Sequence, residues 1–148
     1  MITNVSIVSV FVTDQDEAKA FYLDKLGFVE SADVTLGDGY RWCAVCHPDH
    51  PELVINLAIP GPPLDPDFIE AVKRALAKGQ HNGPGLETDD CVKTIEDLKA
   101  KGVEVLQEPA DRPYGVEALI RDNSGNWLVI VEPKELDLSQ FEQGATRN

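Results

Sequence analysis

The residues Leu53-Val54-Ile55 recur as Leu128-Val129-Ile130, at a shift of about 75 positions along the chain. Three further pairs share this shift: Thr13-Asp14 with Thr88-Asp89, Leu23 with Leu98, and Gly27-Phe28 with Gly102-Val103. Each match is short, but all fall at the same distance and at corresponding places in the local patterns. A constant shift of this kind indicates that one structural unit occurs twice.

The first copy predicts one strand, one helix and then three strands. Val5 to Val12 alternates β-branched residues with period two, as a half-buried strand does. Thr13 or Asp14 is placed to cap a following helix, and Gly27 supplies a left-handed stop. The three strands that follow are expected at Phe28 to Leu36, Tyr40 to Cys46 and Glu52 to Ala58.

The second copy repeats this order. A strand is expected near Gly83 to Thr88, followed by a helix from about Asp90 to Lys101 that ends at Gly102. Three further strands are expected near Val103 to Gln107, Val116 to Arg121 and Trp127 to Glu132. The turn before the last strand is Asp122-Asn123-Ser124-Gly125.

The chain is long enough for one sizeable core, so residues 1–148 are interpreted as a single domain. The boundaries are 2–58 for the first βαβββ module and 82–133 for the second. Residues 59–81 form a linker, with a helix that begins at Asp65-Pro66 and ends at Gly79. Residues 134–148 form a polar tail. The expected class is α+β, with the two modules forming curved mixed sheets around a cavity.

The charge balance excludes several kinds of partner. Thirteen Lys and Arg face 26 Asp and Glu, which gives a formal net charge of −13. Nucleic acid and anionic membrane surfaces would be repelled. No targeting segment and no apolar run of about 20 residues is visible. Three cysteines, Cys43, Cys46 and Cys91, are best interpreted as reduced thiols, so we expect a soluble, cytoplasmic protein.

Several motifs carry a family resemblance. Val12-Thr13-Asp14, Ala20-Phe21-Tyr22 and Leu26-Gly27-Phe28 resemble the opening of vicinal oxygen chelate proteins, a superfamily of glyoxalases, bleomycin resistance proteins and extradiol dioxygenases. Arg112-Pro113-Tyr114-Gly115 and Arg121-Asp122-Asn123-Ser124-Gly125-Asn126 are similar to the last hairpin of that family. With the duplicated βαβββ order, the resemblance extends over most of the chain.

This resemblance, over about residues 2–133, implies a cavity in which four side chains, usually His and Glu, bind a divalent ion in the metal-dependent members. Aliphatic side chains and glycine cannot ligate a cation. At the corresponding positions this chain has Ile7, Val54 (with Asn56 as the next residue on the same face), Gly83 and Val129. We therefore expect a divergent member with no metal site and no cofactor.

Two weaker signals concern cysteine and histidine. Cys43-Ala44-Val45-Cys46-His47 has the spacing of covalent haem attachment, but that chemistry needs an exported chain. One buried cysteine and a polar turn is the favoured interpretation, and a zinc site from Cys46, His47 and His50 remains the alternative. His81 is expected as a solvated loop residue, with a metal-ligand role if the register slips.

The predicted ligand-binding cavity combines apolar, aromatic and a few polar side chains. Ser9 and Asn56 are its sparse polar contacts. Trp42 and Trp127 fit a stacking role or the core equally well. Arg112 and Tyr114 suit an anion contact, although a tight turn with a surface ion pair is favoured. The full set is Ile7, Ser9, Phe11, Trp42, Val54, Asn56, Arg112, Tyr114, Trp127 and Val129.

Three functions fit this pattern. The first is a metal-free protein, like the bleomycin-resistance branch, that binds an apolar or aromatic small molecule in the cavity. The second is a glyoxalase-like lyase or isomerase with displaced or non-metal catalytic residues, such as a cavity acid at Glu87 or Glu132. The third is an interaction module whose pocket has closed. No catalytic residue can be assigned, and a homodimer is expected because open edge strands need cover.

Overall fold

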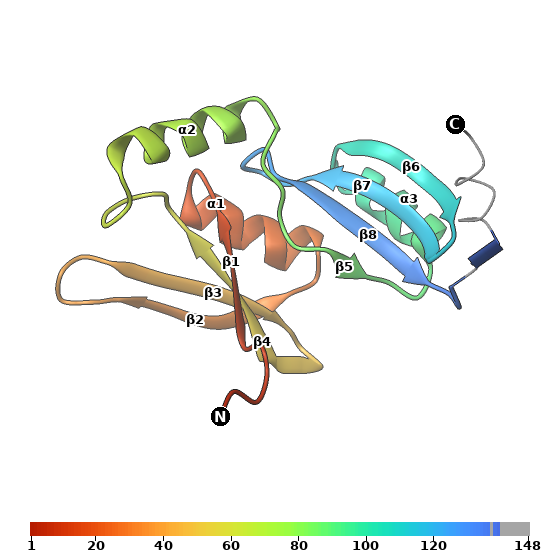
Figure 1. The fold of residues 1–148 in the computed structure, drawn as a ribbon, viewed down its shortest axis with the longest axis horizontal. Helices are drawn as coiled ribbons and strands as arrows, with labels where there is room; N and C mark the ends of the chain where they lie inside the picture. Colours follow the sequence, from red (N-terminus) through yellow and green to blue (C-terminus); the bar gives the residue numbers. More distant parts are fainter. Residues whose placement is uncertain (137, 140–148) are drawn as a thin grey trace. The chain divides into compact units, whose positions relative to one another are not determined.

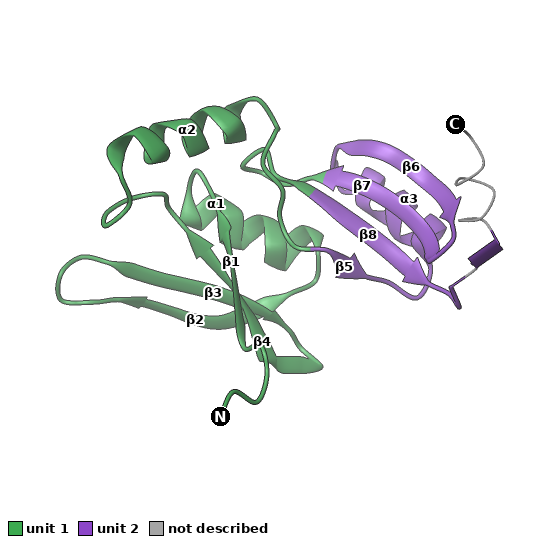
Figure 2. Cartoon of the chain, viewed as in Figure 1, with its two compact units in different colours: residues 1–84, 121–127 green, residues 85–120, 128–148 purple. Residues whose placement is uncertain are grey.

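The computed structural model describes residues 1–136 and 138–139, which form two compact units (Figure 2). Unit 1 consists of Met1–Pro84 and Arg121–Trp127. Unit 2 consists of Gly85–Ile120 and Leu128–Asn148, of which residues 137 and 140–148 are not described. Most of the predicted tail, 134–148, therefore lies outside the described residues. The turn at 121–127 belongs to unit 1, although the strands on either side of it belong mainly to unit 2.

Sheet 1 lies in unit 1 and has four strands in the order β1-β4-β3-β2 (Figure 1). They are β1 (Ile7–Phe11), β2 (Val29–Thr35), β3 (Arg41–His47) and β4 (His50–Ala58). β1 pairs with β4 in parallel, and the other neighbours are antiparallel, so the sheet is mixed.

The helices of unit 1 begin and end at the expected signals. Asp14 caps α1 (Gln15–Ala20) by accepting the Glu17 N–H at 2.8 Å, and the chain leaves this region through Gly27 at φ 79°. The last turns, Phe21–Lys25, are a π-helix, which the sequence pattern did not predict. The linker helix α2 (Pro66–Ala77) has Asp65 as its cap.

Sheet 2 lies in unit 2 and has the order β5-β8-β7-β6. Its strands are β5 (Leu86–Glu87), β6 (Val105–Arg112), β7 (Gly115–Arg121) and β8 (Trp127–Pro133), and α3 (Cys91–Ala100) lies between β5 and β6 in the chain. β5 pairs with β8 in parallel, as β1 does with β4. Two four-stranded mixed sheets with their helices confirm the predicted α+β fold of two βαβββ modules, and neither sheet closes on itself.

Each unit has its own core. In unit 1, α1 packs against β3 and β4, and one face of sheet 1 is buried with Ala18 and Tyr22 of the helical segment. We call this the inner face; it contains Val10, Cys43, Val45, Ile55 and Leu57. In unit 2 the buried side chains are Cys91, Ile95, Leu98, Ala118, Ile120, Leu128 and Ile130. Side chains alternate along a strand, so the intervening residues form an outer face on each sheet.

β6 is longer than the sequence predicted. Its pairing with β7 continues through two register shifts to Arg112, which lies opposite Gly115. Arg112 is therefore a strand residue, and only Pro113 and Tyr114 form the turn. Bulges allow the pairing to continue past the point where the sequence alternation breaks. No helix among the described residues is long and apolar enough to cross a membrane.

Candidate ligand-binding site

The strand register brings six of the predicted site residues onto the outer face of sheet 1. Ile7 of β1 lies opposite Val54, and Ser9 lies opposite Asn56. Asn56 in turn lies opposite Ala44 of β3, two residues from Trp42. Because alternate residues share a face, Phe11 and Trp42 belong to the same surface. The face thus comprises Ile7, Ser9, Phe11, Val29, Ala32, Val34, Trp42, Ala44, Cys46, Val54, Asn56 and Ala58.

This outer face is predominantly apolar and only partly buried: Ala44, Cys46 and Asn56 are buried, and the residues around them are half-buried or exposed. Ile7 is 49% exposed and Val34 is 51% exposed, while Phe11, Trp42 and Val54 are half-buried. Where one face of a sheet contacts only water, the residues on that face are usually polar. An exposed apolar face of this composition is typical of a surface that binds a ligand or another macromolecule.

Asn56 and Ser9 form the polar centre of the face. Asn56 is only 6% exposed, and its Nδ2 donates to Ser9 Oγ at 3.2 Å. Its Oδ1 is the one buried side-chain oxygen or nitrogen, within 1–136 and 138–139, that has no hydrogen-bond partner. Unpaired buried acceptors are rare in folded proteins because they lose hydration without compensation.

The Phe11 end of the face contacts a histidine. The rings of Phe11 and His81 meet edge to face, with centroids 5.8 Å apart. His81 Nδ1 lies 2.9 Å from Asn126 Oδ1, and the His81 carbonyl accepts the Trp127 N–H at 3.0 Å. His81 is half-buried and hydrogen-bonded, whereas the sequence predicted a solvated loop residue. It belongs to no cluster of three or more possible metal ligands among the described residues.

The turn 122–126 ties this histidine to the core of unit 1. The Asp122 carboxylate accepts the backbone N–H groups of Ser124 and Asn126, both at 2.9 Å, the Asn126 side-chain amide at 2.9 Å and the Tyr22 hydroxyl at 3.2 Å. Gly125 has φ 100°, and a Cβ there would lie 2.1 Å from the Leu76 carbonyl, so only glycine fits. The turn could be predicted from the sequence, but its polar network could not.

Arg112 and Tyr114 lie in unit 2 and converge on a residue that the sequence analysis missed. Arg112 Nε is 3.7 Å from Glu117 Oε1, and its Nη2 donates to Gln107 Oε1 at 3.4 Å. The Tyr114 hydroxyl donates to Glu117, and this hydrogen bond raises the pKa of Tyr114. Both side chains thus already have partners. Val129 is half-buried on β8 and belongs to the outer face of sheet 2.

The cysteines of the motif on β3 lie on opposite faces of the strand. Cys43 lies on the inner face and Cys46 on the outer face, and both are buried. Burial raises the pKa of the Cys43 thiol. The rings of His47 and His50 are 5.6 Å apart at the β3–β4 turn. Across 1–136 and 138–139, no three His, Cys, Asp or Glu side chains come together as metal ligands.

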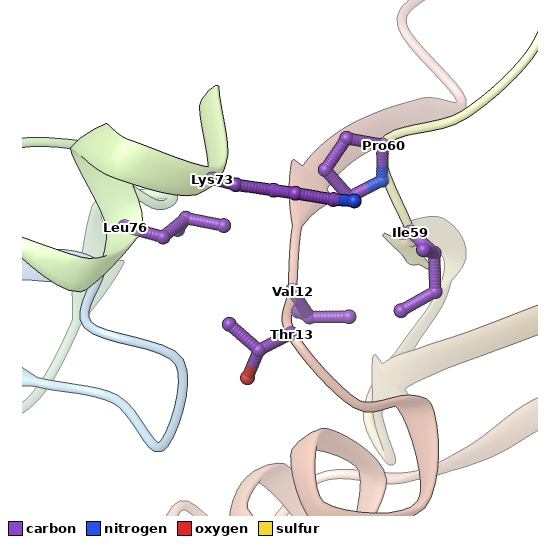
Figure 3. Close-up of a pocket in the computed structure, with 6 residues that line it drawn as sticks. All are labelled: Val12, Thr13, Ile59, Pro60, Lys73 and Leu76. Atoms are coloured by element: carbon purple, nitrogen blue, oxygen red, sulfur yellow. The ribbon is translucent and has the colours of Figure 1, made fainter. Parts of the chain in front are cut away.

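A separate pocket of about 190 Å³ lies beside α2 in unit 1 (Figure 3). Its lining residues are Val12, Thr13, Ile59, Pro60, Lys73 and Leu76. None of the predicted site residues lines it. It is smaller than the roughly 300 Å³ at which ligand sites usually begin, so we do not assign the ligand to it.

A family model for the Glyoxalase/Bleomycin resistance protein/Dioxygenase superfamily matches residues 4–130. The chain belongs to this superfamily. The match includes both sheets and confirms the resemblance on which the sequence analysis relied.

Three relatives illustrate the superfamily's range. The chain is 32% identical to the Bacillus subtilis protein YurT over 128 residues, covering 86% of this chain and 98% of YurT. It resembles the crystal structure of UcmS2 at 40% identity and TM-score 0.82, covering 89% and 99% of the two chains. It also resembles TnmS3, an antibiotic binding protein from Streptomyces sp. CB03234, at 30% identity and TM-score 0.71, covering 90% and 98%.

Proposed function

We propose that the protein is a metal-free small-molecule binding protein, with the outer face of sheet 1 as its ligand surface. The observation that carries this proposal is the exposed apolar character of that face, with Phe11 and Trp42 on it and one polar centre at Asn56. Aromatic side chains stack on planar ligands, so the expected ligand is an apolar, planar aromatic molecule. The similarity to an antibiotic binding protein supports the same class of function.

The metal-free state is part of this proposal. Burying a divalent ion against Ile7 and Val54 would leave its charge uncompensated, at a cost of several kcal/mol or more. The alternative of a lyase or isomerase needs an acid or base in the site. Glu132, one candidate acid, accepts the backbone N–H of Cys91, the first residue of α3, at 3.0 Å, while Asp90 caps that helix. Three buried, free cysteines favour a reducing compartment such as the cytoplasm.

Phenanthrene, a planar hydrocarbon, is a suitable probe because it carries no polar group. We expect it to bind the wild-type protein in equilibrium dialysis. The variant Ile7→Asp should bind it about tenfold more weakly, because the bound hydrocarbon would desolvate a carboxylate. Ile2→Asp is the matched control, since Ile2 is 94% exposed and precedes the strands. Absence of phenanthrene binding to the wild type would overturn the proposal.

We also propose a homodimer. β1 and β2 are the edge strands of sheet 1, and β5 and β6 are those of sheet 2. Unpaired edges and exposed apolar residues are commonly covered by a second copy. Light scattering at micromolar concentration should give twice the chain mass of 16.2 kDa. A mass equal to that of one chain would contradict the proposal.

A further inference from the structure

The ring of His81 has two nitrogen atoms in different surroundings. Nδ1 faces the side-chain oxygen of Asn126 at 2.9 Å. Nε2 makes no hydrogen bond to any described residue and is not sealed from solvent. Which nitrogen carries the proton of the neutral ring therefore depends on which way round the Asn126 amide lies.

The orientation of that amide is fixed by two acceptors. Asn126 is fully buried, and its Nδ2 donates to the Phe11 carbonyl at 2.8 Å and to Asp122 Oδ2 at 2.9 Å. A carbonyl and a carboxylate can only accept. Turning the amide over would place its oxygen against both of them, and each would lose its donor. The oxygen of Asn126 therefore faces His81.

Because the Asn126 oxygen can only accept a hydrogen bond, the His81 Nδ1 that faces it must carry a proton. The neutral ring of His81 is thus the Nδ1–H tautomer, and the lone pair lies on Nε2. The same ring packs edge to face on Phe11, at one end of the outer face of sheet 1. The network from Asp122 through Asn126 thus holds beside Phe11 a ring whose Nε2 has a lone pair that no described protein group uses.

We infer that Nε2 of His81 accepts a hydrogen bond from the ligand, and that the protein selects planar aromatic ligands that carry a hydroxyl group, such as phenols. This inference rests on the proposed function, because it names the ligand class of the same face. Asn126 and Asp122 are positioning residues: they hold the ring and set its tautomer without touching the ligand.

The tautomer can be tested on the wild-type protein without any ligand. Long-range ¹H–¹⁵N correlation spectra of protein labelled with ¹⁵N-histidine, at alkaline pH, should show a protonated Nδ1 and an unprotonated Nε2 for His81. His47 provides an internal contrast, because its Nδ1 accepts the Asp49 N–H at 3.1 Å and its proton should lie on Nε2. A proton on Nε2 of His81 would overturn the inference.

Ligand selection is tested by three probes that share one ring system: phenanthrene, 9-phenanthrol and 9-methoxyphenanthrene. The wild type should bind 9-phenanthrol about five- to tenfold more tightly than the other two, the value of one net hydrogen bond. His81→Phe keeps an aromatic ring beside Phe11 and should lose this preference without losing phenanthrene. Ser6→Ala, an exposed change before β1, should keep it.

The outcomes separate the two proposals. Failure of all three probes to bind the wild type would overturn the proposed function, and the inference with it. Equal affinity for the three probes would leave the proposed function standing and overturn the inference. A preference for 9-phenanthrol that survives in His81→Phe would also overturn it, since the acceptor would then lie elsewhere. If His81→Phe does not fold, the spectra of the wild type still decide the tautomer.

Discussion

Two buried asparagines in unit 1 have opposite surroundings. Asn126 is fully buried, and both its amide hydrogens and its oxygen have partners. Asn56 is almost as deeply buried, yet only its Nδ2 has a partner and its oxygen has none. A satisfied network stabilises a fold, whereas an unsatisfied polar group lowers its stability. The turn 122–126 therefore stabilises unit 1, whereas the unpaired Asn56 oxygen on the outer face of sheet 1 lowers its stability.

The largest effect is expected from Asn126→Ala. It removes the side-chain donor to the Phe11 carbonyl and one of several donors to Asp122, and it leaves His81 Nδ1 unpaired. With about 1 to 3 kcal/mol for each orphaned buried group, we expect a loss of about 4 kcal/mol in the free energy of unfolding by urea. Asn123→Ala, at an exposed position in the same turn, should cost less than about 1 kcal/mol. Similar losses in both variants would mean that the network is not what stabilises the turn.

A smaller loss is expected from Tyr22→Phe. The Tyr22 hydroxyl donates to the buried Asp122 carboxylate at 3.2 Å, so its removal should cost about 2 kcal/mol at neutral pH. Tyr40→Phe, which removes an exposed hydroxyl, should change stability by less than about 0.5 kcal/mol.

The difference in free energy of unfolding between the wild type and Tyr22→Phe should depend on pH. Burial raises the pKa of Tyr22 well above its ordinary value of 10, and the neighbouring Asp122 charge adds to the shift. Above pH 10 the unfolded chain therefore loses this proton first, and the wild type loses stability as the pH rises. The phenylalanine variant has no such group at this position, so the gap between the two proteins should narrow above pH 10. A constant gap would indicate that Tyr22 ionises equally in both states.

The fold could be predicted from sequence because its signals are local. Alternation placed Ile7, Ser9 and Phe11 on one face, and Asp65-Pro66 with Gly79 gave the limits of α2 almost to the residue. The π-helix at Phe21–Lys25 and the extension of β6 to Arg112 were missed. Both depend on packing and on bulges, which interrupt the periodicity that sequence reasoning uses.

The site was less predictable, because its decisive contacts join distant residues. Tyr22 and Asp122 are 100 positions apart, and Phe11 and Asn126 are 115 apart. No local pattern shows which carboxylate or amide a side chain will meet. A signal for the turn was nevertheless present, since Asp122 followed by Ser124, Gly125 and Asn126 suits an aspartate that accepts nearby backbone N–H groups. Glu117 gave no such signal, and its role depends on the pairing of β7 with β6, which places it opposite Ala110 and within reach of Arg112 and Tyr114.

The smallest effect, and the one of opposite sign, is expected from Asn56→Val. Valine suits the strand and removes an acceptor that has no partner, while only one hydrogen bond, to the Ser9 hydroxyl, is lost. We expect a gain of about 1 kcal/mol in the free energy of unfolding, measured by urea denaturation. Ser9→Ala removes the same hydrogen bond but leaves the buried Asn56 amide nitrogen without a partner, so it should instead cost about 1 kcal/mol. A loss of stability in Asn56→Val comparable to that in Asn126→Ala would show that both asparagines stabilise the fold. A gain accompanied by weaker binding of 9-phenanthrol would instead show that Asn56 contributes to ligand binding at a cost in stability.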